Sequence, residues 1–158
     1  MRGDERTMLR IWLDWQRATL LWKCELLDGD SLSRRVLSTS NLSLLGIVRH
    51  MALVEWSWFE RVFAGSDAAG PISLAEDDDA DFNRVDPARA DDDVDMFHRQ
   101  CEISRGIEAA AGSLDDLGAW TKQDISLRWI MVHMIEEYAR HNGHADLLRE
   151  AIDGAVGE

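Results

Sequence analysis

The chain is poor in residues that interrupt helices, cross-link loops or carry positive charge. Its 158 residues include two prolines, two cysteines and 17 lysines and arginines, against 30 aspartates and glutamates, for a net charge of −13. Cys24 and Cys101 lie far apart and form no C-x-x-C pair, which excludes a disulfide scaffold and a zinc knuckle. We therefore expect a reducing, cytoplasmic location. The shortage of basic residues argues against nucleic acid or an anionic membrane as a partner.

Long hydrophobic runs are also missing. No charge-free stretch approaches the roughly 20 apolar residues that a membrane-spanning helix needs. The N-terminus carries charges of both signs and does not resemble a signal peptide. A length of 158 residues with 46% apolar content is typical of one globular unit, so we expect a single domain over residues 1–158.

The spacing of apolar residues predicts an all-α protein. Pro71 and Pro87 both lie in the middle third, and apolar residues recur every three or four positions in segments of about 5–27, 44–63, 92–114 and 126–153. No segment alternates with a period of two, so a sheet is not expected. Four such segments predict a four-helix bundle. The inward stripes that we predict for the first two helices are Met8, Trp12, Trp15, Thr19, Trp22 and Leu26, and Leu44, Ile47, Val48, Met51, Val54, Trp58 and Val62.

Helix ends are marked by polar residues and glycine. Asn41 and Ser43 are candidate N-caps of the second helix, and Gly65 is the expected residue just past its end. Ser126 is the expected N-cap of the fourth helix, with Gly154 beyond its last turn.

A long acidic crossover separates the second and third helices. The join between Gly65 and Ala90, roughly 25 residues, is longer than an ordinary helix–helix turn. Residues 76–95 hold ten acids and two arginines, a net charge of −8. We interpret this segment as a solvated linker whose acidity says little about an active site, because like-charge blocks repel themselves. Its spacing does not match a calcium-binding loop.

The fourth helix carries the most informative polar residues. At about 100° per residue, Glu137 and His141 fall inside its apolar stripe of Ile130, Met134, Ala145, Leu148 and Ile152, whereas Glu136 falls outside it. Residues i and i+4 can converge on one point. Either a divalent metal or a hydrogen bond between Glu137 and His141 would satisfy a carboxylate buried there. The spacing alone leaves both possibilities open.

The remaining histidines are less informative from spacing alone. His133 and His144 lie at the edge of the fourth helix's stripe, where each is a partner of a ligand, a third ligand or a partly exposed residue. His98 is expected to face solvent. His50 lies at the border of the second helix's stripe, and geometry alone favours an ordinary border histidine there.

Two segments resemble the DinB superfamily. They are Leu44 to Phe63, with His50 and the aromatic-rich Glu55–Phe59, and Ile135 to His144. The branch that the chain resembles is related to mycothiol-dependent maleylpyruvate isomerase. The resemblance implies an up-down-down-up four-helix bundle that often forms homodimers. It also implies a metal site of His50, Glu137 and His141, with His144 where a glutamine is usual. Most of the seven tryptophans are expected in the core.

The resemblance also implies a chemistry. Three protein ligands leave an open metal position that takes the thiolate of mycothiol or bacillithiol, and zinc, or nickel or iron, would lower the pKa of that thiol. The thiolate would attack a small electrophile, as a transferase or an isomerase does. A non-enzymatic metal- or ligand-binding stress protein is the alternative, and metal-assisted hydrolysis with His144 as base is a third. Neither cysteine is expected to be catalytic.

Overall fold

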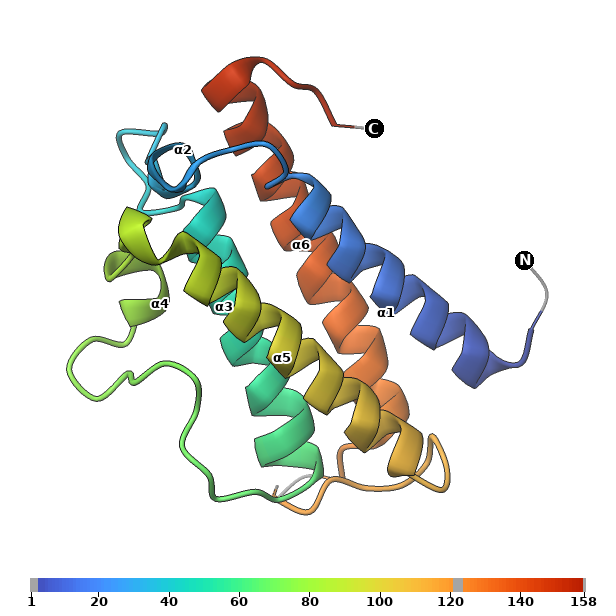
Figure 1. Cartoon of the computed structure of the whole chain (residues 1–158). Coiled ribbons are helices and arrows are strands. Elements are labelled where there is room, and N and C mark those ends of the chain that lie inside the picture. The colour runs from blue at the N-terminus through green and yellow to red at the C-terminus, as the bar shows by residue number, and fades with distance from the viewer. Residues whose placement is uncertain (1–2, 121–123, 158) are drawn as a thin grey trace.

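The computed structural model describes residues 3–120 and 124–157, and the chain there is all-helical (Figure 1). No strand forms in these residues beyond one isolated bridge between Leu117 and Ser126. The long elements are α1 (Glu5–Trp22), α3 (Leu44–Glu55) continued by the π-helical η1 (Trp56–Phe63), α5 (Ala90–Ala110) and α6 (Leu127–Asp153). The short elements are α2 (Gly29–Ser33), α4 (Ala80–Asn83) and the 3₁₀ turn η2 (Pro87–Arg89). The prediction of an all-α bundle is confirmed.

The four long helices follow the up-down-down-up order that the resemblance implied. In Figure 1, α1 and α6 run in one direction, and α3 and α5 run in the other. The main packing partners are α3 with α5 and α1 with α6, and α3 also packs on α6. Because α3 and α5 are parallel, the chain must return along the whole bundle between them, which explains the length of the crossover.

Four of the expected helix ends are formed as the sequence indicates. The Ser43 hydroxyl caps α3 by accepting from the Gly46 N–H at 3.1 Å, so Asn41 is not the cap. Ser126 caps α6 by accepting from the Trp129 N–H at 3.3 Å. Gly65 and Gly154 adopt left-handed φ angles of 71° and 82° just past their helices, a conformation that glycine allows without a Cβ clash.

The predicted inward face of the first helix is wrong. The helix ends at Trp22 rather than near Leu27, and its predicted apolar stripe faces outward. The buried positions are instead Leu9, Leu13, Gln16, Arg17 and Leu20. Both stripes repeat every three or four residues, so periodicity cannot choose between them. Leucine packs without leaving a polar atom unpaired, whereas a buried indole N–H needs an acceptor.

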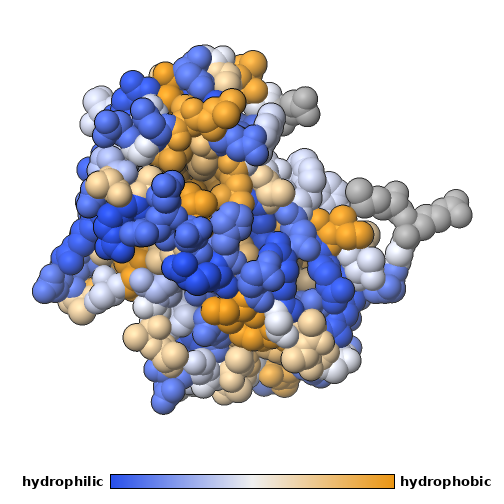
Figure 2. Space-filling model, viewed as in Figure 1, coloured by the Kyte–Doolittle hydropathy of each residue, from blue (hydrophilic) through white to orange (hydrophobic). Residues whose placement is uncertain are grey.

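Most of the tryptophans lie outside the core, which corrects a second expectation. Those with exposed side chains are Trp12, Trp15, Trp22, Trp120 and Trp129. Trp56 and Trp58 are half-buried. The face that α1 and α5 present is mostly hydrophilic, with scattered hydrophobic patches, in keeping with the acidic composition (Figure 2).

The second helix also departs from its predicted stripe in its second half. Its buried positions after Met51 are Ala52, Glu55 and Phe59, while Val54, Trp58 and Val62 are half-buried. The helix widens into the π-helical turns of η1, where Ala64 N–H donates to the Phe59 carbonyl five residues back. A π-helical turn holds more residues than an α-helical turn. The next buried position after Glu55 is therefore Phe59, four residues on, and not the predicted Trp58.

The other two helices are closer to expectation. The helix α5 begins two residues before the predicted position 92 and ends four before 114, with Asp91, Asp92 and Asp93 in its first turn. In α6 the predicted stripe is buried, and only Ile152 is partly exposed.

A polar cluster inside the bundle joins all four long helices. Arg17 of α1 donates from Nε and Nη2 to the two carboxylate oxygens of Glu55 on α3, at 2.7 and 2.8 Å. The Tyr138 hydroxyl on α6 donates to the same carboxylate at 2.7 Å, and Cys101 of α5 lies 3.9 Å from it. Each of these four residues is buried. No sequence pattern indicated this cluster.

The acidic crossover is not simply a solvated linker. Asp81 in α4 and Asp93 at the start of α5 are both 4% exposed, and Arg49 of α3 binds this region. Most of the other acids between 76 and 95 are exposed or half-buried, as expected of a solvated segment. No helix in the described part of the chain is long and apolar enough to span a membrane.

Candidate metal centre

Three residues that the resemblance selected lie together between α3 and α6. Ligand atoms of His50, Glu137 and His141 all lie within 4.8 Å of one another. Glu137 and His141 come from successive turns of α6, with Oε2 and Nε2 3.7 Å apart. His50 approaches from α3, its ring centroid 4.7 Å from that of His141. Packing of α3 against α6 therefore supplies the histidine that periodicity alone could not place.

The cluster lies at the edge of the bundle, partly open to solvent. His141 is buried, with 8% of its surface exposed. The side chains of His50 and Glu137 are 23% and 17% exposed. The cluster is therefore not sealed inside the core.

His50 is held by the crossover. Its Nδ1 lies 2.7 Å from Oδ2 of Asp81, and its ring stacks on Phe82 at 4.8 Å between centroids with 27° between the planes. A carboxylate oxygen accepts hydrogen bonds and does not donate them. The Nδ1–H of His50 therefore donates to Asp81, which leaves the Nε2 lone pair free on the other side of the ring.

The donor set fits a divalent metal. Burial, together with His50, His144 and Arg140, lowers the pKa of His141 to about 4, so the imidazole is neutral near pH 7, the form that binds metals. A histidine ligand usually donates its other ring N–H to a carboxylate, as His50 does to Asp81. Two imidazoles and one carboxylate suit zinc and also non-haem iron(II).

His133 lies beside the same carboxylate but belongs to an aromatic cluster. Its ring stacks on Trp129 at 4.9 Å and meets Trp58 edge-on at 4.6 Å. Its Nε2 lies 3.6 Å from Oε1 of Glu137, the oxygen that does not face His141. A second group of possible ligands, His133, Glu136 and Glu137, shares Glu137 with the first and is therefore not an independent site.

The remaining candidates divide between the site and the surface. His144 lies edge-on to His141, with centroids 5.3 Å apart. The Nδ1 atoms of both rings are buried and have no hydrogen-bond partner among the described residues. Glu136 points away from the stripe and pairs with Arg140, and His98 is exposed, as expected.

The residue missed by the sequence analysis is Asp81. We expected a solvated linker throughout the acidic crossover, and that expectation is wrong for this residue, which is buried against His50. The signal in the sequence was a block of charge, and nothing in the block distinguished Asp81 from its exposed neighbours. The distinction arises from the docking of α4 on α3.

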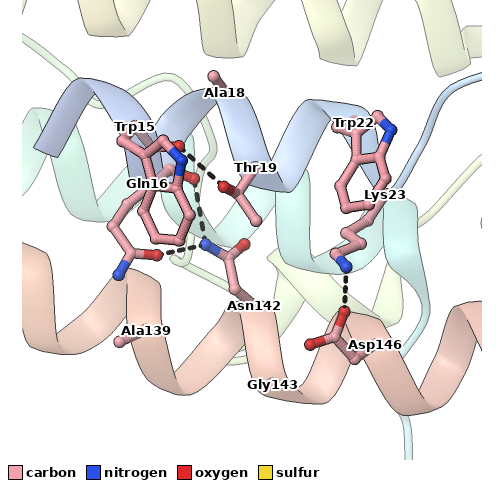
Figure 3. Close-up of a pocket in the computed structure, with 10 residues that line it drawn as sticks. All are labelled: Trp15, Gln16, Ala18, Thr19, Trp22, Lys23, Ala139, Asn142, Gly143 and Asp146. Atoms are coloured by element: carbon pink, nitrogen blue, oxygen red, sulfur yellow. Dashed lines mark hydrogen bonds and ion pairs between the residues drawn. The ribbon is translucent and has the colours of Figure 1, made fainter. Parts of the chain in front are cut away.

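A separate groove lies between α1 and α6 (Figure 3). It has a volume of about 500 Å³, and Trp15 and Trp22 of α1 flank it. Asn142 spans the groove floor and donates to the backbone and side-chain oxygens of Gln16, and Lys23 pairs with Asp146. Asn142 adjoins His141 in the chain, but no metal-ligand candidate lines this groove.

Both cysteines are buried and unpaired. Burial raises the pKa of each thiol to about 12, so neither is a nucleophile near neutral pH. The expectation that they form no disulfide is confirmed.

Comparison with known proteins supports the resemblance found in the sequence. Neither curated proteins nor solved structures gave a match to the chain. The model of one family, described as mycothiol-S-transferase, matches residues 8–154. Because this match includes all four long helices almost entirely and every residue of the His50, Glu137 and His141 cluster, the chain belongs to the mycothiol S-transferase family.

Proposed function

We propose that the protein is a metal-dependent transferase that joins a low-molecular-weight thiol, mycothiol or a close analogue, to a small electrophile. The observation that carries this proposal is the convergence of His50, Glu137 and His141 within 4.8 Å, in a chain of the mycothiol S-transferase family. Zinc is the metal that we propose, with nickel and iron as alternatives that the same ligands accept.

The residues of the chain provide most of what such a reaction needs. A divalent metal held by the three ligands would lower the pKa of the thiol, so that its sulfur is present as the thiolate near neutral pH. The S–H proton passes to solvent or to a nearby base, and His144, edge-on to His141, is the base that we propose. The sulfur forms a bond to the electrophilic carbon, and the leaving group departs with the electron pair of the bond that breaks.

The surroundings of Glu137 support an apolar or aromatic electrophile. Trp58, Trp129 and His133 form an aromatic wall on the side of Glu137 that faces away from His141. The Arg140 guanidinium lies 3.8 Å from Glu137 Oε2, where it also favours anionic groups. A flat, weakly polar substrate would therefore bind between the aromatic wall and the metal ligands.

Elemental analysis together with a thiol-dependent assay tests the proposal. We expect about one divalent metal per chain in the purified protein, lost in His50→Ala and kept in His98→Ala, which removes an exposed histidine elsewhere on the bundle. Wild type should consume a chlorobimane dye with mycothiol, and His50→Ala should not. Metal retention without thiol turnover across a panel of electrophiles would favour the binding-protein alternative. Hydrolysis without any thiol would favour the hydrolase.

We also propose that the protein forms a homodimer in the cytoplasm. The outer face of α1 exposes Met8, Ile11, Trp12, Trp15 and Trp22. Several large apolar side chains exposed on one helix are typical of an interaction surface. Light scattering during size exclusion should give twice the chain mass, and Trp12→Glu should reduce it to one chain. Leu147→Glu, on an exposed position of α6, is the control and should remain dimeric.

The proposed cytoplasmic location is supported by the two cysteines. Both thiols are unpaired, as is usual in a reducing compartment.

A further inference from the structure

We propose that Asp81 is a positioning residue of the metal site, and that the segment around α4 is a clip that holds His50 ready to bind the metal. The proposal rests on the proposed metal site. It adds that part of the acidic crossover acts on the metal through His50.

The contact between Asp81 and His50 is short and shielded from water. Oδ2 lies 2.7 Å from Nδ1, and Asp81 is 4% exposed. The same carboxylate accepts from the Phe82 N–H through Oδ1 at 3.1 Å, which fixes its orientation. A carboxylate that accepts the N–H of a histidine fixes which ring nitrogen is protonated and makes the free nitrogen a stronger donor to a metal.

Arg49, the residue before His50, anchors the segment that carries Asp81. Its Nε donates to the Asp81 carbonyl at 2.9 Å, and its Nη2 donates to the Ala80 carbonyl at 3.3 Å. Its Nη1 donates to Asp93 Oδ1 at 2.8 Å, at the start of α5. One half-buried guanidinium thus joins α3, α4 and α5 beside the histidine, so the crossover is fixed where Asp81 acts.

One face of the His50 ring packs on Phe82. The two rings stack at 4.8 Å, which restricts rotation of the imidazole. Gly46, one turn before His50, permits this approach, because a Cβ atom there would lie 3.1 Å from Phe82 Cδ1. Asp81 and Phe82, adjacent in the chain, therefore fix the ring by a hydrogen bond and by stacking.

The neighbouring acids of the crossover have other contacts. Asp77 accepts from Asn83, Glu76 pairs with Arg84, and Asp78 is exposed with no side-chain partner among the described residues. Among the acids between 76 and 95, Asp81 is the one that contacts His50. Asp78 therefore offers a matched control, since it has the same residue type and loop but none of the contacts.

The test compares Asp81→Ala, Asp81→Asn and Asp78→Asn with wild type, using Zn²⁺ and a competing chromogenic chelator. We expect Asp81→Ala to weaken zinc binding by about 10- to 100-fold, the range found when such supporting carboxylates are removed. The zinc affinity of Asp81→Asn should lie between those of wild type and Asp81→Ala, because the amide oxygen still accepts a hydrogen bond but has no charge. Asp78→Asn should bind zinc as wild type does. Circular dichroism of each variant checks that α-helix content is kept.

A second readout does not depend on metal or activity. In the chelator-treated protein, nitrogen NMR of the His50 ring should show the ring proton on Nδ1 in wild type and in Asp78→Asn. In Asp81→Ala the proton should exchange between Nδ1 and Nε2. The proposal is overturned if Asp81→Ala binds zinc as tightly as Asp78→Asn, or if wild type holds the proton on Nε2. If wild type binds no metal, the proposed function fails, and the nitrogen spectrum still decides whether Asp81 orients His50.

Discussion

Two adjacent glutamates on α6 have different surroundings. Glu136 is exposed and pairs with Arg140, whereas Glu137 is 17% exposed at its side chain and lies between His133 and His141. This difference was predicted from the helical period, because residues one apart differ by about 100° around the axis. Glu137 is therefore the one of the two that we propose as a metal ligand.

Replacing that charge at constant size gives the first prediction. Glu137→Gln should lose most of the bound metal and the thiol-conjugation rate, because an amide oxygen is a far weaker ligand for zinc than a carboxylate. Elemental analysis and the dye assay measure the two effects. Glu136→Gln is the control, one position away on the exposed side. Equal metal content in the two variants would contradict the assignment of Glu137.

The second prediction concerns the two thiols. Their pKa of about 12 leaves only a trace of thiolate at pH 8, so a chromogenic disulfide reagent should label neither in the native protein. Both should react in guanidinium chloride, where burial is lost. Rapid labelling of one thiol in the folded state would show that Cys24 or Cys101 is accessible and would reopen a role for it in catalysis.

At the scale of elements, the internal polar cluster decides how the helices are held together. Glu55 accepts from Arg17 of α1 and Tyr138 of α6, and lies beside Cys101 of α5. A helix shifted by one turn would leave the carboxylate or the guanidinium unpaired inside the bundle. The cluster therefore favours one arrangement of the four helices over its neighbours.

The third prediction follows from that cluster. Glu55→Ala removes the buried carboxylate that binds Arg17 and leaves that guanidinium with the half-exposed Asp14 alone. It should therefore lower the free energy of unfolding by about 3–5 kcal/mol, measured by urea denaturation. Tyr138→Phe removes one hydrogen bond to a charged group and should lower it by about 1.5–3 kcal/mol. The double variant Arg17→Met with Glu55→Leu should recover most of the loss, because no unpaired charge remains. A double variant as unstable as Glu55→Ala would argue against the ion pair.

The elements also show where prediction from sequence succeeds. In α6 one apolar stripe stands out, and its buried face and both ends were predicted. In α1 a leucine stripe and a tryptophan stripe have the same spacing, and the wrong one was chosen. In α3 a change to π-helical turns moved the buried stripe, and no residue pattern announced it. The spacing of apolar residues predicts the buried face of a helix only when one face is clearly more apolar than the others and the number of residues per turn is constant.

At the scale of the whole molecule, the bundle order was predictable and the site only in part. The long crossover indicated a parallel pair of helices, and family resemblance supplied His50 as the partner of the two candidate ligands on α6. The contact of Asp81 with His50 spans 31 residues and depends on α4 docking against α3 through Arg49 and the carbonyls of Ala80 and Asp81. Backbone carbonyls carry no sequence signal, so such a contact is visible only in the fold.

The last prediction concerns how the metal acts on the bundle. His50 comes from α3, and Glu137 and His141 come from α6, so a metal bound by all three joins two helices that are far apart in the chain. The unfolded chain holds these residues apart and binds the metal weakly. Free Zn²⁺ at 100 times its dissociation constant should therefore raise the free energy of unfolding by about 2.7 kcal/mol. Urea denaturation with and without zinc measures the increase. His98→Ala should show the same increase and His50→Ala almost none. An increase of equal size in His50→Ala would mean that zinc stabilises the protein from some other site, since a two-ligand remnant on α6 alone no longer links the helices.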